Sequence, residues 1–328
     1  MKKFFKNKGI YILIIISLIL PLLNGCTNIN NKSKKDKIRI AEQYGLAYAP
    51  IQIMKAKKIL EKNLPDTDIS WKQMGNTAAI REGMISNRVD IGFMAIPPFL
   101  IGWDRGMDWK IMSGVSSMPV GLVTYDSDIK SIEDFKIDDR IALPQPGSIQ
   151  HILLSMASQK TFGDSHKLDN LLVTMTHPDG MNALLAKKDI TAHFTSPPYI
   201  FKELEREGFR EVLSGREAMG KDFTFIIGVA TKTFHDKNSK EYNAFIESLY
   251  DAIEFINNNP EEAADILSKE YRLPKKEVLR YITSDKTVYS SSVKGLEDFS
   301  DFMKKNGYIN NSIDNIEEIL WEDVKYDK

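Results

Sequence analysis

From Ile38 onward, short apolar runs alternate along the chain with longer amphipathic stretches. Short apolar runs are typical of buried strands, whereas apolar residues spaced by three or four positions are typical of helices. Strands are predicted at 38–44, 69–74 and 89–95, and helices at 50–64 and 76–87. Pro50 suits a first helical turn and Asn76 suits an N-cap. This alternation predicts an α/β fold with largely parallel sheets.

The same order of elements appears a second time without any sequence identity between the two halves. Here the strands are predicted at 140–145, 171–176 and 190–195, and the helices at 148–161 and 178–188. A further strand is predicted at 223–234, followed by helices at 239–259, 260–271, 274–282 and 296–307. The repeated order predicts two α/β lobes, and the chain is long enough to form both.

The N-terminal 26 residues have a different pattern, "MKKFFKNKGIYILIIISLILPLLNGC". Lysines precede an apolar run at 10–20, which is too short to span a bilayer and fits a secretory signal peptide. The tetrapeptide Leu23-Asn24-Gly25-Cys26 resembles a bacterial lipobox. The resemblance implies cleavage before Cys26 and a lipid on its sulfur. Cys26 is the only cysteine, so it cannot form an internal disulfide. The alternative is an ordinary signal peptide with an incidental cysteine.

These patterns predict a signal peptide at 1–25 and a polar, lipidated tether at 26–36, with the protein anchored on the extracytoplasmic face of the cell membrane. The whole chain has a net charge of −1, and residues 1–25 contribute +4, so the rest carries −5. That balance is not one of a nucleic-acid-binding protein. No second run of about 18 apolar residues follows, so we expect no other membrane-crossing segment.

Five loops that follow predicted strands have a common, uncharged character. They read "EQYGLAYAP", "QMGNTAA", "FMAIPPF", "LPQPGSIQH" and "FTSPPYI". Charged residues make up 27% of the chain, yet these loops contain no Lys or Arg and a single acid, Glu42. Open α/β sheets bind ligands at the carboxyl ends of their strands, so these loops are the candidate binding site.

Two of these loops lead into helix N-termini behind a glycine, at Gly75 and Gly147. Free N–H groups and the positive end of the helix dipole make such a start an anion site, although plain capping of surface helices is the alternative. His151 could hydrogen-bond a ligand oxygen from the first turn, or be a partly exposed helix residue. His193 lies in a strand pattern and is expected in the core. The remaining histidines, His166, His177 and His235, lack metal-ligand spacing, so no metal site is predicted.

Three segments carry a resemblance to a known family: "VDIGFMAIPPFLIGWDRG", "SIEDFKIDDRIALPQPGSIQHILL" and "DGMNALLAKKDITAHFTSPPYIF". They resemble the solute-binding lipoproteins of the nitrate, sulfonate and taurine ABC importers over roughly residues 37–260. The resemblance implies the periplasmic-binding-protein type II fold, with lobe I at 37–123 and 225–328, lobe II at 124–224, and a ligand cleft between them. The chain would cross between the lobes near 123–126 and 220–225.

The loops and the resemblance together give twelve candidate ligand-binding residues: Gln43, Tyr44, Asn76, Thr77, Met94, Gly147, Ser148, Gln150, His151, Thr195, Ser196 and Tyr199. The resemblance implies capture of a small organic anion, such as an aliphatic sulfonate, taurine or a nitrate-like solute, and delivery to a permease and its ATPase. We expect a monomer without catalysis, cofactor or nucleic-acid partner.

Three alternatives stay open. One is a binding protein for a neutral heterocycle such as a thiamin pyrimidine precursor. The second is a pyrimidine-synthesis enzyme of the same fold, although those enzymes carry a cysteine-rich metal segment and this chain has no cysteine beyond Cys26. The third is a lipid-anchored adhesin or signalling module without a small ligand.

Overall fold

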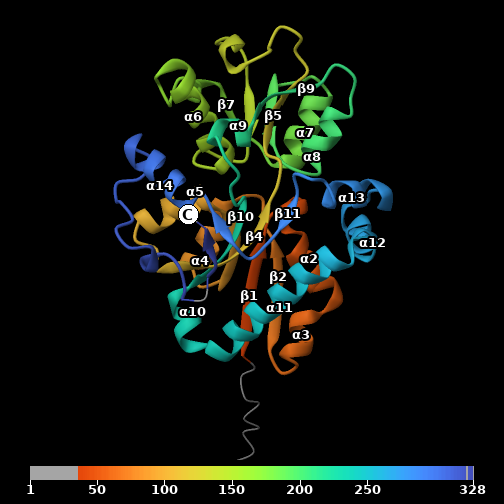
Figure 1. Ribbon diagram of the computed structural model, residues 1–328, viewed down its shortest axis with the longest axis vertical. Coiled ribbons are helices and arrows are strands. Elements are labelled where there is room, and N and C mark those ends of the chain that lie inside the picture. The colour runs from red at the N-terminus through yellow and green to blue at the C-terminus, as the bar shows by residue number, and fades with distance from the viewer. Residues whose placement is uncertain (1–35, 323, 328) are drawn as a thin grey trace, which may run out of the picture. The chain divides into compact units, whose positions relative to one another are not determined.

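The computed structural model describes residues 36–322 and 324–327. Residues 37–328 form one compact unit (Figure 1). The predicted signal peptide, the lipidated Cys26 and all of the tether except Asp36 lie outside the described residues. Within the described residues, no helix has the length and apolar character needed to cross a membrane.

A six-stranded sheet has the order β11-β4-β10-β3-β1-β2. Its strands are β1 (Lys37–Glu42), β2 (Asp68–Gln73), β3 (Ile91–Ala95), β4 (Trp109–Ser117), β10 (Ile226–Thr231) and β11 (Val288–Tyr289). β1 pairs in parallel with β2 and β3, while β10 runs antiparallel between β3 and β4. Every residue of β3 is buried, as expected for a strand covered on both faces. We call this sheet with its helices lobe I.

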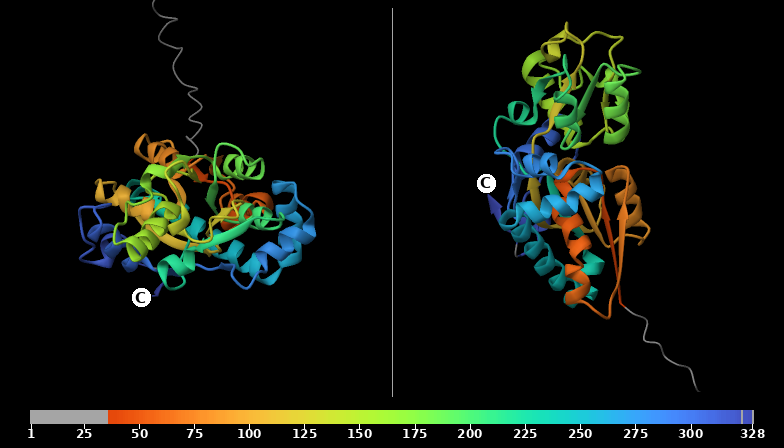
Figure 2. Two further views of the ribbon diagram at one scale, coloured as in Figure 1. Left: turned by 90° about the horizontal axis from the view of Figure 1, so that it is seen from above. Right: turned by 90° about the vertical axis from the view of Figure 1, so that its right-hand side faces the viewer.

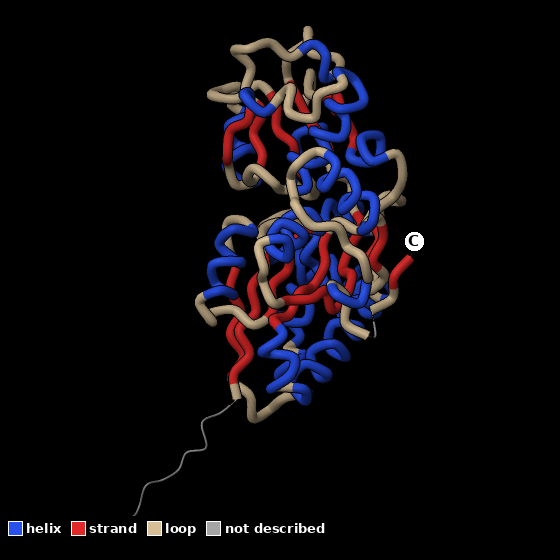
Figure 3. The backbone as a smooth tube through the Cα atoms, turned by 90° about the vertical axis from the view of Figure 1, so that its left-hand side faces the viewer, coloured by secondary structure: helices blue, strands red, loops and turns tan. Residues whose placement is uncertain are grey.

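A five-stranded sheet has the order β7-β6-β8-β5-β9. Its strands are β5 (Gly121–Thr124), β6 (Ile141–Leu143), β7 (Leu172–Thr174), β8 (Ala192–Thr195) and β9 (Arg210–Ser214). β6 pairs in parallel with β7 and β8, and β5 is antiparallel to β8 and β9. We call this sheet with its helices lobe II. Figure 3 shows the two groups of strands in red, one above the other, each with helices around it.

The helices follow the predicted alternation. Lobe I has α2 (Ala49–Lys57), α3 (Ile59–Asn63), α4 (Thr77–Ile85), α5 (Ile96–Asp104), α10 (Lys232–Lys237), α11 (Ser239–Asn258), α12 (Pro260–Tyr271), α13 (Lys275–Ile282) and α14 (Leu296–Lys305), and lobe II has α6 (Ile149–Phe162), α7 (His177–Leu185), α8 (Tyr199–Leu204) and α9 (Gly215–Met219). The N-caps predicted at Asn76 and Ser148 are confirmed, because each side chain accepts a hydrogen bond from a first-turn N–H group.

Two predicted elements differ most from the structure, while the ends of several others shift by one to three residues. The helix expected at 50–64 is divided at Lys58, whose left-handed φ of 53° ends α2. The strand expected at 223–234 ends at Thr231, because the Thr231 side chain accepts from the Phe234 N–H group and begins α10. In both places a local cap ends an apolar pattern that reads as continuous in the sequence.

The chain passes from lobe I to lobe II between β4 and β5, and returns between α9 and β10. The first crossing occupies Met118–Val120, because β5 already pairs with β8 and β9 in the second sheet. It therefore precedes the expected position at 123–126. "MPVGLVT" reads as one apolar run, so its pattern does not show where one sheet ends and the other begins.

The C-terminal segment after α14, residues 306–322, contacts both lobes, and its blue backbone runs near the junction of the lobes in Figure 2. In lobe I, the Ile111 N–H group donates to the Ile319 carbonyl and the Trp321 N–H group donates to the Ile111 carbonyl. On lobe II, the Tyr308 hydroxyl donates to Ser155 Oγ of α6 at 2.8 Å. The short strands β12 (Val293–Lys294) and β13 (Tyr326–Asp327) pair in parallel beside these contacts. The C-terminal segment thus joins the lobes a third time, through backbone hydrogen bonds to lobe I and a side-chain hydrogen bond to lobe II.

Candidate functional site

A pocket with an empty volume of about 470 Å³, including space open to solvent, lies between the two lobes. Its walls come from strand ends and helix starts, as expected for ligand sites in open α/β sheets. Lobe I contributes Gln43, Tyr44, Tyr48, Gly75, Thr77, Ala95, Pro98 and Ile226, the second crossing contributes Phe225, and lobe II contributes Pro144, Gln145, Ser148, Ile149, Gln150 and His177. Among these described lining residues there is no Lys, Arg, Asp or Glu.

Two helix N-termini meet at this pocket, one from each lobe. Ser148 caps α6 and its hydroxyl oxygen accepts from the His151 N–H group at 3.3 Å. Asn76 caps α4 and accepts from the Ala79 N–H group at 3.0 Å. The Ala78 N–H group donates across the lobes to Gln145 Oε1 at 3.1 Å. This bond satisfies one of the free amides of α4 with a side chain of lobe II, and it ties the two helix starts together.

Five of the twelve predicted residues line the pocket: Gln43, Tyr44, Thr77, Ser148 and Gln150. Gln43 Nε2 donates to Thr77 Oγ1 at 3.1 Å and to the Phe93 carbonyl at 3.2 Å. These bonds hold Gln43 in place, and they leave the Thr77 hydroxyl proton available, because Thr77 Oγ1 acts there as an acceptor. The Ser148 hydroxyl proton is available for the same reason.

The other seven predicted residues are outside the lining: Asn76, Met94, Gly147, His151, Thr195, Ser196 and Tyr199. Met94 is wholly buried in the core of lobe I. Thr195 and Tyr199 lie directly behind the pocket, where both contact the His177 ring. As ligand contacts, these seven stay predictions.

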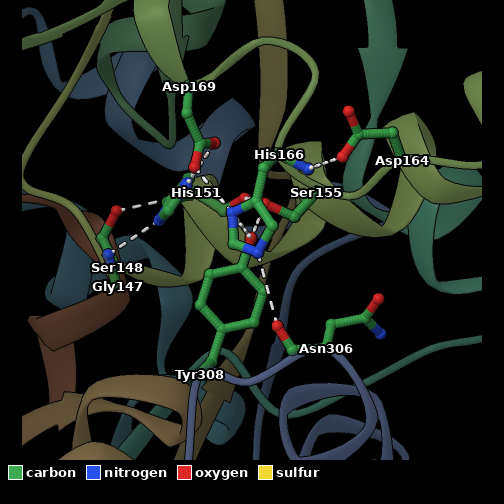
Figure 4. Close-up of polar contacts among 9 residues, drawn as sticks. All are labelled: Gly147, Ser148, His151, Ser155, Asp164, His166, Asp169, Asn306 and Tyr308. Atoms are coloured by element: carbon green, nitrogen blue, oxygen red, sulfur yellow. Dashed lines mark hydrogen bonds and ion pairs between the residues drawn. The ribbon is translucent and has the colours of Figure 1, made fainter.

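The His151 ring is occupied on both nitrogens by protein groups (Figure 4). Nδ1 accepts from the Gly147 N–H group at 2.9 Å, and Nε2 lies 3.0 Å from Asp169 Oδ1. The side chain is only 6% exposed. The ring therefore fixes the loop before α6, at a glycine with a φ of 77°, and lies outside the pocket-lining set.

Asp169 links this loop to the C-terminal segment. Its Oδ2 pairs with His166 Nδ1 at 2.8 Å, and His166 Nε2 lies 3.3 Å from the Asn306 carbonyl oxygen of lobe I (Figure 4). The hydrogen bond with Asp169 raises the pKa of His166, and the two imidazoles hold the pKa of Asp169 below its usual value despite its burial. The contact between lobes at this place is therefore a hydrogen-bonded chain from Asp169 through His166 to the Asn306 carbonyl group.

His177 is one of the ten pocket-lining residues that were not among the twelve candidates, and it is the ionisable imidazole of the described lining. It is the first residue of α7, capped by Thr176, and its ring stacks on Tyr199 with centroids 5.7 Å apart. Its Nε2 lies 3.4 Å from Gln150 Nε2 and its Nδ1 lies 3.0 Å from Thr195 Oγ1. The signal was present in "THPDG", where a capping threonine follows a strand pattern and places the histidine at a helix start.

The single acid of the predicted loops, Glu42, is not part of the pocket lining. It is 3% exposed, and burial raises its pKa to about 8. Gln43, the next residue on the chain, faces the pocket in its place. Hydroxyl, amide and imidazole groups therefore supply the polar contacts of the pocket, together with aromatic rings.

The lobes contact each other at several points around the pocket. The Leu46 N–H group of lobe I donates to the Pro197 carbonyl of lobe II at 2.9 Å. Phe201 of α8 stacks on Tyr281 of α13 with centroids 4.8 Å apart, and Arg280 forms an ion pair with Glu205 beside them. These contacts bring the strand-end loops of both lobes together around one pocket.

Two α/β lobes around a pocket at the ends of their strands are the architecture of the periplasmic-binding-protein fold. The chain is 22% identical over 299 residues to the putative aliphatic sulfonates-binding protein of Escherichia coli (strain K12). The match covers 89% of this chain and 90% of that protein. No protein-family model matches the chain.

Two solved structures are similar to this chain in fold, and their names also refer to the binding of a sulfonate or of nitrate. The alkanesulfonate-binding protein of Xanthomonas axonopodis pv. citri, bound to MOPS, has a TM-score of 0.71 at 19% identity, over 83% of this chain and 94% of that one. The periplasmic nitrate-binding protein of Synechocystis PCC 6803 has a TM-score of 0.69 at 12% identity, over 89% and 87%. The predicted fold and the resemblance to sulfonate- and nitrate-binding proteins are confirmed.

Proposed function

We propose that this chain is the solute-binding component of an ABC importer and that its interlobe pocket captures a small organic anion. The observation that carries the proposal is the meeting of two capped helix N-termini, one from each lobe, in a pocket without acidic or basic lining residues. Helix starts and hydroxyl groups hold an anion without a formal counter-ion. The names of the related proteins support a sulfonate-like or nitrate-like ligand.

A ligand bound between the lobes would control whether the permease recognises the protein. A ligand that contacts both helix starts favours the form in which the lobes touch, and only this differential affinity shifts the equilibrium. The form with the lobes together would then be recognised by the permease and its ATPase. We propose that the chain acts as a monomer, since each pocket wall comes from the same chain.

A ligand panel with matched variants tests this function. Wild-type protein from Asn28 onward should be stabilised by methanesulfonate, taurine or nitrate, and a ligand at 100 times its Kd adds about 2.7 kcal/mol. Ser148→Ala should weaken binding of that ligand about tenfold or more, because a hydrogen bond to a charged group contributes about 1.5–3 kcal/mol. Calorimetry measures the affinities.

Ser214→Ala is the matched control. Ser214 also caps a helix of lobe II, α9, by accepting from the Glu217 N–H group at 3.1 Å, but it lies outside the pocket lining, so Ser214→Ala should cost stability without the loss of affinity. Stabilisation by a neutral pyrimidine and by none of the anions would support the alternative ligand class, for which Tyr44 and Tyr48 offer aromatic faces. Turnover of any panel member would contradict a pure binding role.

We further propose that the chain is held at the extracytoplasmic face of the membrane by a lipid on Cys26. The proposal rests on the lysines, the apolar run and the lipobox-like tetrapeptide that precede it. Cys26→Ser should leave the precursor unprocessed or release the protein from membranes, as seen by detergent partitioning and by its mass. A variant that still partitions into detergent and is processed as the wild type would refute the lipid anchor.

A further inference from the structure

Three ionisable side chains lie in a row that runs from the pocket wall into lobe II: His177, His193 and Glu203. His193 Nδ1 lies 2.6 Å from Glu203 Oε1, and its Nε2 lies 3.5 Å from His177 Nδ1. They come from three elements, the start of α7, strand β8 and helix α8. His177 is the member that lines the pocket.

The inner pair is shielded from water. His193 and Glu203 are both 0% exposed, and Glu203 Oε2 has no hydrogen-bond partner within the described part of the chain. Gly180 makes room for the His193 ring, because a Cβ at that position would lie 2.6 Å from His193 Nε2. Burying ionisable groups costs free energy unless the groups are paired and hydrogen-bonded to each other.

The remaining groups around the two rings are uncharged at neutral pH. Gln150 faces His177 from α6, Thr195 from β8 and Tyr199 from α8. Burial raises the pKa of Tyr199, so its hydroxyl stays protonated. Burial also raises the pKa of Glu203 and lowers the pKa of both histidines, which makes a neutral carboxylic acid beside two neutral imidazoles the resting state.

In this state the Glu203 acid donates to His193 Nδ1, and the His193 proton is on Nε2, toward His177 Nδ1. The His177 proton is then on Nε2, toward Gln150 and the pocket. The amide nitrogen of Gln150 lies nearest to His177 Nε2, at 3.4 Å, and turning the amide by 180° would present its oxygen to this proton, since the hydrogen-bond network decides which end of an amide faces a partner. The Thr195 hydroxyl can donate to or accept from His177 Nδ1, so it fits either protonation state.

We propose that Glu203, His193 and His177 form an internal proton relay that gives the pocket a cation only when an anion occupies it. The Glu203 O–H bond breaks as an N–H bond forms at His193 Nδ1. The His193 Nε2–H bond breaks as an N–H bond forms at His177 Nδ1. The products are a buried Glu203 carboxylate, a neutral His193 and a cationic His177, so no proton is taken from water. This inference rests on the proposed function and adds how a pocket without Lys or Arg holds a charge.

The relay predicts a distinctive pH profile for the affinity of an anion. In the wild type the proton is stored inside, so affinity for methanesulfonate should stay flat between pH 5 and 8, below the raised pKa of Glu203. Glu203→Gln keeps the shape and a donor to His193 but removes the stored proton. Its affinity at pH 7 should fall about tenfold or more, and should then rise by about tenfold per unit as the pH falls, because the cation must now take its proton from solvent.

Calorimetry from pH 5 to 8 measures both profiles, and Glu211→Gln is the matched control. It removes a carboxylate of the same lobe outside this row, so its profile should match the wild type. If Glu203→Gln weakens binding by the same factor at every pH, then Glu203 is only structural and the relay is overturned. Uncharged methanesulfonamide, if bound, should lose no affinity on the same substitution.

A ligand-independent measurement separates this inference from the proposed function. In wild-type protein with labelled Glu and His, the carboxyl carbon of Glu203 should have the chemical shift of a protonated acid at pH 7, and that signal should vanish in Glu203→Gln. An ionised Glu203 at pH 7 overturns the relay whether or not any anion binds. A protonated Glu203 with no anion binding would instead leave the relay's resting state in place and refute the proposed ligand class.

Discussion

Gly45→Ala is expected to separate the lobes and to weaken ligand binding by one to two orders of magnitude. Gly45 has φ 123° and ψ 157°, a region that is essentially restricted to glycine. An added Cβ would lie 3.1 Å from the Pro197 carbonyl oxygen, the atom that accepts the Leu46 N–H group across the lobes. Strain of about 1–3 kcal/mol at this contact opposes the form with the lobes together.

Small-angle scattering and calorimetry check this result with a verified ligand. Gly106→Ala is the control, because Gly106 has a similar positive φ of 81° but no atom within 4 Å of its added Cβ. It should carry the backbone strain without opening the lobes. Equal affinity and equal scattering curves for the two variants would show that the Gly45 contact does not govern the approach of the lobes.

Trp109→Ala is expected to destabilise the fold by about 3–5 kcal/mol, the usual cost of removing a buried large aromatic side chain. Trp109 begins β4, is 1% exposed and stacks on Phe99 with centroids 5.5 Å apart. Its ring also fills the space at Gly102, where an added Cβ would lie 2.1 Å from the indole. Urea unfolding of the soluble chain measures the loss.

Trp109→Phe separates packing from polarity. The indole Nε1 has no hydrogen-bond partner among the described residues, so replacing the indole by a phenyl ring costs volume but no hydrogen bond. The loss should therefore be clearly smaller than for alanine. If the two variants are equally unstable, a polar contact of Nε1 and not the packing of the ring holds this part of lobe I.

The alternation of strands and helices was predictable because its signals are local. Apolar runs bounded by loops predicted β1, β2, β3, β6, β7, β8 and β10 but not β4, β5 or β9, and the caps at Asn76 and Ser148 were readable from residue type alone. The first crossing was placed too late because strand pairing, which decides to which sheet β5 belongs, is a long-range property. The division at Lys58 depends on one backbone angle that no apolar pattern reports.

The pocket was only partly predictable for a related reason. In the structure His151 and His177 both lie in the first turn of a helix, yet the His151 ring turns back to the Gly147 N–H group while His177 lines the pocket. Which way each ring turns depends on partners far along the chain, such as Asp169 for one and Gln150 for the other. Residue type and spacing do not contain that information.

The ion pair between Glu205 and Arg280 offers a route to an optical sensor. It joins α8 of lobe II to α13 of lobe I, so two dyes attached there would move apart whenever the lobes part. Both side chains are accessible to labelling reagents, with 40% and 61% exposure. The one cysteine of the chain is Cys26, so in a soluble form that starts at Asn28 two introduced thiols would be the only ones. Energy transfer between the dyes would then report solute concentration directly, without knowledge of the permease.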